Sequence, residues 1–283
     1  FEAVYASAQP GLQEIAGTKR PVFLSTSSAW GVMEGAIRNL VQKKVLNLCC
    51  GAFSDKWFDV SQRCGKEAEK IQSEWGQPID PDLVRAKLAE GGFDTVTLVH
   101  NETSTGVLNP LSEIAGVVND FEDVLLVVDT VSSFSALPLP TDEIGVDVLL
   151  AGVQKAMALP PGLSVFVVSE KALARAEKTN DRGYYFDFLE FEKNHQKNNT
   201  PSTPSISLLY ALDSMVSSIM EEGLAARFRR HSETNALVHK WVEENGFELF
   251  APEGFRSKTL TAIQNNREID VPAFIKAVRE RHN

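Results

Sequence analysis

Short hydrophobic runs alternate with segments of helical periodicity over the first 170 residues of the chain. The runs are four to six residues long and rich in apolar side chains, which is typical of strands buried on both faces of a parallel sheet. They predict strands at 21–24, 45–49, 95–99, 124–128, 147–150 and 163–168. The segments between them predict helices at 3–16, 32–42, about 55–73, 82–90 and 111–119. This alternation indicates an α/β fold with a mostly parallel sheet flanked by helices.

The pattern changes after residue 170. Residues 171–205 are polar and irregular, and the stretch 194–204 is typical of a loop. Further on, the pattern predicts helices at 206–222, 225–245 and 271–281 and strands at 247–250 and 259–263. We therefore expect a large α/β domain over residues 1–205 and the start of a smaller α+β domain over residues 206–283.

The composition is that of an ordinary globular protein, with 43% hydrophobic and 23% charged residues among 283. The net charge of −10 argues against a nucleic-acid partner. No apolar run approaches the ~20 residues that cross a bilayer, so we expect no membrane-spanning segment. Cys49, Cys50 and Cys64 lack metal-like spacing with histidine, and their odd number suits a reducing compartment. We expect a cytoplasmic protein without a metal site.

Candidate chemistry gathers where the predicted strands end. After the first strand, small polar residues lead into a helix, a geometry that directs backbone N–H groups towards an anion. A phosphate would then lie at Ser28, Ala29 and Trp30; the alternative is that Ser28 simply caps the helix. Phe53 follows the strand at 45–49, where it would either stack on a planar ligand or pack in the core.

Two charged residues follow the ends of later strands. Asp129 comes directly after the run 124–128, and a carboxylate there is costly unless a metal, an arginine or a protonated ligand pairs with it. No histidine or second carboxylate nearby completes a metal shell. Lys155 comes after the next strand and after Ala151 and Gly152, two small residues that let another group approach the backbone. Flanked by apolar residues, Lys155 is expected to be poorly solvated, and a neutral amine there can form a Schiff base with an aldehyde; the alternative is a surface lysine.

These four features would meet at one edge of a parallel sheet. Together they describe a ligand that carries a phosphate, a flat ring, a cationic ring nitrogen and an aldehyde. Pyridoxal 5'-phosphate has all four groups, and their coincidence counts for more than any one of them alone.

Three motifs carry a resemblance to a known family: HNETSTGVLNPL (100–111), VVDTVSS (127–133) and GVQKAMALPPGL (152–163). They resemble the class V branch of the fold-type I pyridoxal-phosphate enzymes. The similarity is greatest to alanine–glyoxylate and serine–glyoxylate (serine–pyruvate) aminotransferases, and it extends over nearly the whole chain. It implies a fold-type I transferase that forms a homodimer with active sites at the interface.

The resemblance also implies a role for each residue at the cofactor. Lys155 would bind the cofactor aldehyde and later move the substrate proton, while Asp129 would pair with the ring nitrogen. The other contacts would come from Thr103 and Gln154 at the ring oxygen, Phe53 and Val131 on the ring faces, and Ser28, Ala29 and Trp30 at the phosphate. The neighbouring subunit would complete the phosphate site from a loop at 199–203, with Thr200 and Ser202 as donors.

Two features depart from the family pattern. Trp30 occupies a position in the phosphate turn where relatives have a small residue or histidine. The family's arginine for the substrate carboxylate lies in a C-terminal stretch, and it is matched by none of Arg256, Arg267, Arg279 and Arg281. Because Phe1 is not an initiator methionine either, we expect this chain to belong to a longer one, with parts of both domains outside it.

Taken together, the sequence predicts transamination between a small amino acid, alanine or serine, and a 2-oxo acid such as glyoxylate or pyruvate. Phosphoserine aminotransferase is one alternative, although its lysine motif resembles QKN before a Gly-Pro turn. A class V lyase such as cysteine desulfurase is another, although such enzymes usually have histidine at the positions of Gln154 and Phe53. The third alternative is a protein that binds pyridoxal phosphate without catalysing a reaction.

Overall fold

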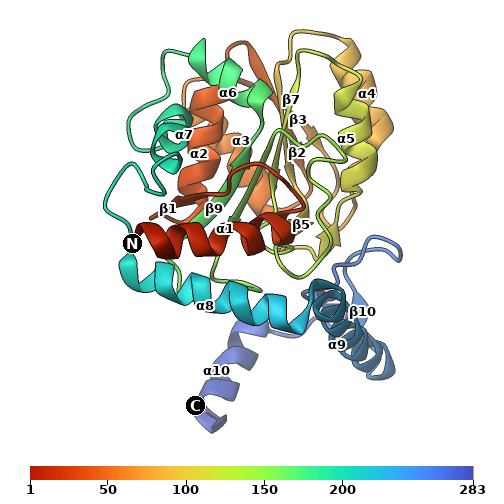
Figure 1. The fold of residues 1–283 in the computed structure, drawn as a ribbon. Coiled ribbons are helices and arrows are strands. Elements are labelled where there is room, and N and C mark those ends of the chain that lie inside the picture. Colours follow the sequence, from red (N-terminus) through yellow and green to blue (C-terminus); the bar gives the residue numbers. More distant parts are fainter. Residues whose placement is uncertain (283) are drawn as a thin grey trace.

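The computed structural model describes residues 1–282, and at its centre is a seven-stranded sheet with helices on both faces (Figure 1). In space the strands follow the order β1-β9-β8-β7-β4-β2-β3. Their bounds are β1 Phe23–Ser25, β2 Lys44–Cys49, β3 Glu67–Gln72, β4 Thr95–Val99, β7 Leu125–Asp129, β8 Val148–Gly152 and β9 Ser164–Val168. The strands from β8 to β3 pair in parallel, whereas β9 and β1 are antiparallel to their neighbours. The predicted mostly parallel sheet flanked by helices is confirmed.

The helices of this part of the chain separate into two groups, one on each face of the sheet. Their bounds are α1 Glu2–Ala16, α2 Ala29–Leu40, α3 Ala52–Arg63, α4 Pro81–Ala89, α5 Leu111–Asn119, α6 Glu170–Glu177, α7 Phe188–His195 and α8 Ile206–Glu222. In β7, Leu126 and Val128 join the core beneath α1, α4, α5 and α8, while Leu125 and Val127 join the core beneath α2, α3, α6 and α7. Successive strand residues point to opposite faces, so a strand covered on both sides is apolar throughout.

One predicted helix, at about 55–73, is wrong in its second half. Helix α3 ends at Arg63, Gly65 adopts a left-handed φ of 72°, and β3 then begins at Glu67. This strand pairs with β2 on one side only and forms the edge of the sheet. Its charged side chains are therefore compatible with a strand, because an edge strand is only partly buried.

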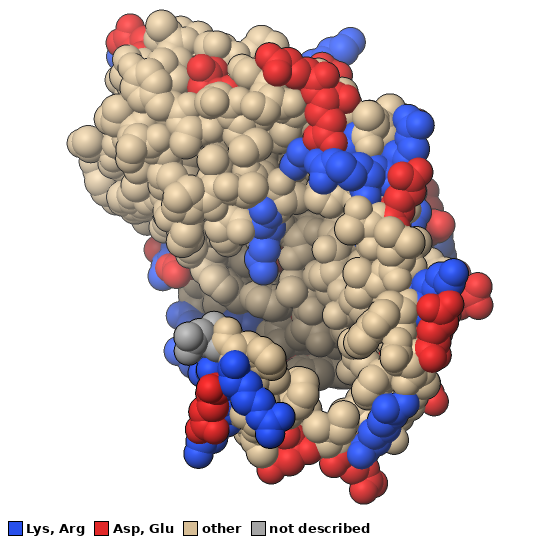
Figure 2. All heavy atoms as spheres, turned by 90° about the horizontal axis from the view of Figure 1, so that it is seen from below, with Lys and Arg blue, Asp and Glu red and all other residues tan. Residues whose placement is uncertain are grey.

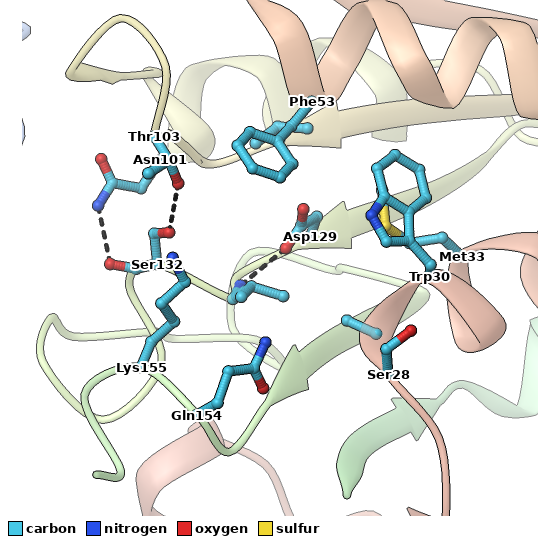
Figure 3. A pocket seen from close by; sticks show the side chains of 13 residues that line it. Ser28, Trp30, Met33, Phe53, Asn101, Thr103, Asp129, Ser132, Gln154 and Lys155 are labelled. Atoms are coloured by element: carbon cyan, nitrogen blue, oxygen red, sulfur yellow. Dashed lines mark hydrogen bonds between the residues drawn. The ribbon is translucent and has the colours of Figure 1, made fainter. Parts of the chain in front are cut away.

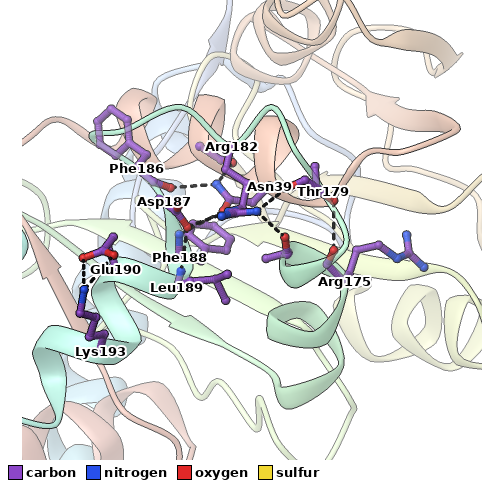
Figure 4. Close-up of polar contacts among 12 residues, drawn as sticks. Asn39, Arg175, Thr179, Arg182, Phe186, Asp187, Phe188, Leu189, Glu190 and Lys193 are labelled. Carbon is purple, nitrogen blue, oxygen red and sulfur yellow. Dashed lines mark hydrogen bonds and ion pairs between the residues drawn. The ribbon is translucent and has the colours of Figure 1, made fainter.

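The prediction that 171–205 is irregular is also wrong, because α7 and all of α6 except its first residue lie within it. Each helix has a side-chain cap: Ser169 Oγ accepts from the Ala172 N–H, and Asp187 accepts from the Leu189 N–H. The turn between them is anchored by Arg182, which pairs with Asp187 at 2.9 Å (Figure 4). Asn39 of α2 holds the same turn by donating to the Phe186 carbonyl and accepting from the Phe188 N–H (Figure 4).

The last part of the chain lies below the sheet in Figure 1. Helix α8 runs beside α1, and its residues Leu209, Leu212, Val216 and Ile219 belong to the core on that face. After it come α9 Leu224–Glu244, the antiparallel pair β10 Glu248–Leu249 and β11 Ile263–Gln264, and α10 Val271–His282. The observed strands are shorter than the predicted ones, and β11 meets the predicted 259–263 only at Ile263. The division into domains 1–205 and 206–283 stays a prediction.

None of the helices formed by residues 1–282 combines the length and the hydrophobicity needed to traverse a bilayer.

Candidate active site

A cavity of about 280 Å³ lies at the carboxyl ends of the parallel strands, where the loops after β2, β4, β7 and β8 meet (Figure 3). It contains every residue predicted for this chain's own part of the cofactor site. These are Ser28, Ala29, Trp30, Phe53, Thr103, Asp129, Val131, Gln154 and Lys155. Met33, Val99, Asn101 and Ser132 also line it and were not predicted. The fold thus brings together residues that are more than a hundred positions apart in the sequence.

One end of the cavity is formed by the start of α2 and by two aromatic rings. Ser28 is the N-cap of α2, but its side chain makes no capping hydrogen bond within the described chain. Trp30 and Phe53 lie with ring centroids 6.5 Å apart and planes 20° from parallel. Phe53 is 37% exposed and lines the cavity, so it is not a core residue. A helix start without its side-chain cap, beside flat apolar rings, suits a phosphorylated planar ligand.

Asp129 ends β7 at the floor of the cavity and is only 5% exposed. In the described part of the chain its carboxylate accepts one hydrogen bond, from the Val131 N–H at 2.7 Å. Burial raises the pKa of Asp129 from 3.8 to about 7, and the nearby Glu102 adds to the rise while Lys155 opposes it. A buried carboxyl group that accepts so few hydrogen bonds is suited to a ligand that carries a positive charge.

Glu102 is fully buried behind the cavity wall and was not predicted as a site residue. Its carboxylate accepts from the Ser54 N–H at 3.0 Å and from Ser104 Oγ at 2.7 Å, which fixes the first turn of α3. Gly51 makes this approach possible, because a Cβ there would lie 2.5 Å from Glu102 Cγ. Glu102 therefore holds the helix start that carries Phe53.

A network of polar side chains holds the loop after β7. Thr103 Oγ1 lies 2.6 Å from Ser132 Oγ, and Asn101 donates to the Ser132 carbonyl at 2.8 Å (Figure 3). His100 is buried with Nδ1 2.9 Å from Ser133 Oγ, and burial lowers the pKa of His100 to about 4. The sequence signal for this network was the high density of polar residues directly after two buried strands. Burying so many polar side chains is costly unless they form hydrogen bonds with one another.

Lys155 is exposed, which contradicts the expectation of a poorly solvated side chain. Its apolar neighbours Val153 and Met157 are buried, but Lys155 itself points into open space between two cavities. The second cavity, of about 290 Å³, shares Thr103, Ser132 and Lys155 with the first and adds Ala156, His231, Thr259 and Leu260. The face of the molecule seen from below is deeply hollowed (Figure 2). Lys155 is thus accessible to a ligand from either cavity.

Gln154 confirms the expectation that small residues allow a close approach at the end of β8. Its side chain folds over Gly152, where a Cβ would lie only 2.4 Å from Gln154 Oε1. This arrangement brings Gln154 to the cavity beside Lys155. Any larger residue at position 152 would push the amide out of place.

Thr200 and Ser202 lie outside this chain's own cavity. They line a separate small recess beside Leu24, Thr26 and Tyr185. The family resemblance implies that these two residues serve the site of a neighbouring subunit, and this role stays a prediction.

No group of three or more His, Cys, Asp or Glu side chains in residues 1–282 could hold a metal ion. Among the residues that line this cavity in the described chain, the exposed Lys155 and the buried Asp129 are the two with ionisable side chains. Amine and carboxyl can together bind and polarise a ligand that has a carbonyl group and a basic ring nitrogen.

Comparison with known proteins agrees with this chemistry. The chain is 36% identical over 277 residues to an uncharacterized aminotransferase of Methanocaldococcus jannaschii, covering 96% of this chain and 72% of that protein. It is 34% identical over 279 residues to the serine–glyoxylate aminotransferase of Methylorubrum extorquens, covering 94% of this chain and 69% of that protein. The crystal structure of alanine–glyoxylate aminotransferase from Nostoc sp. superposes with a TM-score of 0.94 at 28% identity, and the match covers 100% of this chain and 76% of that one.

The family described as aminotransferase class V matches residues 45–276, a range that includes both Asp129 and Lys155. This range contains the parallel part of the sheet and the three sequence motifs. The chain belongs to the class V aminotransferase family.

Proposed function

We propose that this protein uses pyridoxal 5'-phosphate to transfer an amino group from a small amino acid, alanine or serine, to a 2-oxo acid such as glyoxylate or pyruvate. The observation that carries the proposal is one cavity with a buried carboxyl group, Asp129, at its floor and an exposed amine, Lys155, at its edge. The names of the Methylorubrum and Nostoc proteins support glyoxylate as acceptor and serine or alanine as donor.

The residues present fit the cofactor. The start of α2 at Ser28, Ala29 and Trp30 would hold the phosphate, and Phe53 and Val131 would cover the two ring faces. Thr103 and Gln154 would donate to the ring oxygen. Asp129 would pair with the ring nitrogen, and Lys155 would bind the aldehyde. Each group of the cofactor thus has a matching residue in the cavity. The clearest match is Asp129, a buried carboxyl group that accepts a single hydrogen bond in the described chain and would be stabilised by a cationic ring nitrogen.

When bound, the cofactor supplies an aldehyde for the amino group and a ring that withdraws electrons from the substrate Cα. Asp129 would keep the ring nitrogen protonated, because a buried carboxylate opposite a cation is stabilised in its charged form. Lys155 Nζ would hold the cofactor aldehyde and, once a substrate amine replaces it there, would be the amine that moves the proton leaving the substrate Cα. The exposure of Lys155 allows a substrate to reach this amine.

The predicted homodimer belongs to the same proposal. Thr200 and Ser202 line a recess away from this chain's cavity, which agrees with a role in the site of a second copy. Each copy would then lend hydroxyl groups to its partner's phosphate site. Analytical ultracentrifugation with and without cofactor tests this: a monomer at all concentrations would contradict it.

The chemistry of the cysteines argues against the desulfurase alternative within the described chain. Such an enzyme needs a mobile thiol that reaches the substrate. Cys49 and Cys50 are buried, and burial raises their pKa. Cys64 is partly buried, and none of the three lines the cavity.

An absorbance experiment separates the remaining possibilities. We expect the purified protein to bind pyridoxal phosphate with a visible band that Lys155→Ala abolishes. L-Alanine or L-serine should bleach this band, and glyoxylate, pyruvate or 2-oxoglutarate should restore it to differing degrees. A stable band that no amino acid changes would indicate a binding protein without activity, and a preference for phosphoserine would indicate the related aminotransferase. Failure to bind the cofactor at all would overturn the proposal.

A further inference from the structure

Arg227 is a buried cation that lies outside both cavities, on the first turn of α9. Only 6% of its surface is exposed, and all three of its guanidinium nitrogens are engaged. Nε donates to the Ser135 carbonyl at 2.7 Å, Nη2 donates to the Ala156 carbonyl, and Nη1 pairs with Glu222 at 2.9 Å. A planar guanidinium can make these contacts at once because its donors form a fixed fork.

The contacts of Arg227 join three separate parts of the fold. Ser135 belongs to the loop that follows Asp129, and Ala156 directly follows Lys155 in the sequence. Glu222 is the last residue of α8. One side chain therefore ties the loop of the buried carboxyl group to the loop of the reactive amine, and both to the helices below them.

Both loops contain backbone conformations that need outside support. Ser135 has a φ of 63° and Ala158 a φ of 54°, in the left-handed region that side chains other than glycine rarely adopt. Such conformations persist only where the surrounding structure fixes them. The hydrogen bond to the Ser135 carbonyl acts on one of these two residues directly.

We propose that Arg227 is a positioning residue for Lys155: it fixes the separation between the amine and Asp129 by holding the backbones of their two loops. This inference rests on the proposed function for its consequence, since the separation matters only if one cofactor contacts both groups. Arg227 does not line the cofactor cavity and is not itself a catalytic residue.

Arg230 provides a matched control on the same helix. It also bonds Glu222, at 3.0 Å through Nη2, but it is exposed and makes no hydrogen bond to either loop in the described chain. The test therefore compares Arg227→Lys and Arg227→Met with Arg230→Gln. Lysine keeps the charge and loses the fork, so the pair of Arg227 variants separates geometry from electrostatics.

Backbone hydrogen exchange without cofactor is the first measurement. We expect exchange in peptides covering 131–137 and 153–159 to be ~10-fold faster in Arg227→Lys and faster still in Arg227→Met, with Arg230→Gln like the wild type. If circular dichroism shows that Arg227→Met does not fold, the comparison of Arg227→Lys with Arg230→Gln still tests the proposal. Equal exchange in those two variants would overturn the proposal.

The second measurement adds pyridoxal phosphate. A displaced Lys155 should raise the cofactor dissociation constant ~10-fold and shift the pH midpoint of the visible band by ~0.5 in Arg227→Lys, but not in Arg230→Gln. If exchange changes while the dissociation constant and the midpoint stay those of the wild type, the arginine only supports the fold and the inference is wrong. A wild type that binds no cofactor would defeat the proposed function instead, and the exchange data would remain readable.

Discussion

The two reactive groups of the cavity have opposite surroundings. Asp129 is almost fully buried, ends a central strand and lies close to the buried carboxylate of Glu102. Lys155 is exposed, lies on a loop and faces two cavities. In the proposed reaction, the fold would thus exclude water at the carboxyl group that stabilises a charge and admit ligands at the amine that bonds to them. We call the Lys155 side of the cavity its open end and the Asp129 side its closed end. This contrast predicts that substitutions at the open end change the reaction rate alone, whereas those at the closed end change both the reaction rate and the stability of the fold.

The largest effect is expected at the open end. In the proposed reaction, Lys155→Ala would remove both the amine that binds the cofactor and the base that moves the proton, so kcat/KM should fall by ~10⁴-fold or more. Stability of the protein without cofactor should change little, because the side chain is exposed. Steady-state assay and urea unfolding measure the two quantities. Lys56→Ala, another exposed lysine, is the control, and comparable activity in the two variants would refute the role of Lys155.

At the closed end, Asp129→Asn should lower kcat/KM by ~10²- to 10³-fold, because a neutral amide no longer favours a protonated ring nitrogen. The amide has nearly the shape of the carboxyl group, so packing is preserved. Asp59→Asn, at a half-exposed position that pairs with Arg63 outside the cavity, should be neutral. Near-normal turnover of Asp129→Asn would show that the carboxylate does not support the reaction.

The closed end also predicts an unusual dependence of stability on pH without cofactor. The folded-state pKa of Asp129, about 7, lies above its ordinary 3.8, so its contribution to stability is lost as pH rises from about 4 to 7. The folded-state pKa of His100, about 4, lies below its ordinary 6.5, so its contribution is lost as pH falls from 6.5 to about 4. Over the shared range the two contributions oppose each other and largely cancel.

Single substitutions should reveal each contribution. Relative to wild type, Asp129→Asn should gain about 4 kcal/mol between pH 4 and pH 8, since an amide ionises in neither state and so avoids the loss that follows from the easier ionisation of Asp129 in the unfolded chain. His100→Gln should gain a similar amount between pH 7 and pH 4, superimposed on a constant loss from altered packing. Urea unfolding at each pH across this range measures how the free energy of unfolding of the three proteins depends on pH. Parallel curves of this free energy against pH for all three would contradict the roles given to Asp129 and His100.

The parts of the site that the sequence predicted are those fixed by local pattern. Phe53, Asp129 and Lys155 each follow a buried hydrophobic run, and this predicted that they meet at one sheet edge because parallel strands end together. The exposure of Lys155 could not be seen in this way, since its flanking residues are apolar and buried while the loop turns outward. Whether a side chain on a loop meets solvent depends on contacts made elsewhere in the chain.

Tertiary contacts also explain what was missed. Arg227 bonds carbonyl groups 92 and 71 positions away, and no local pattern contains such a pair. The edge strand β3 lacks the apolar signature of its neighbours because only one side of it is paired. Helices α6 and α7 are short and bury few side chains, so their caps, Ser169 and Asp187, were the better signal.

A smaller effect is expected from Glu102→Gln, which keeps the shape of the side chain and removes its charge. The start of α3 would lose its charge-assisted hydrogen bonds, and cofactor affinity should fall ~10-fold as Phe53 becomes less well fixed. Equilibrium dialysis measures this, with the exposed Glu67→Gln as control. If both variants bind the cofactor equally well, Glu102 does not position this wall of the cavity.

The smallest effect tests the aromatic wall between the two ends. Phe53→Leu keeps an apolar side chain but removes the flat surface, and stacking of this kind contributes about 1 kcal/mol, so the dissociation constant should rise ~5-fold. Phe58→Leu, on the same helix but outside the cavity, is the matched control. Because Trp30 stacks beside Phe53, the loss should grow to ~10-fold or more in a variant that also carries Trp30→Leu. A double variant no weaker than Phe53→Leu would mean that the indole does not contribute to this wall, and that its bulk in the phosphate turn must be explained by contacts to the substrate or to a second subunit.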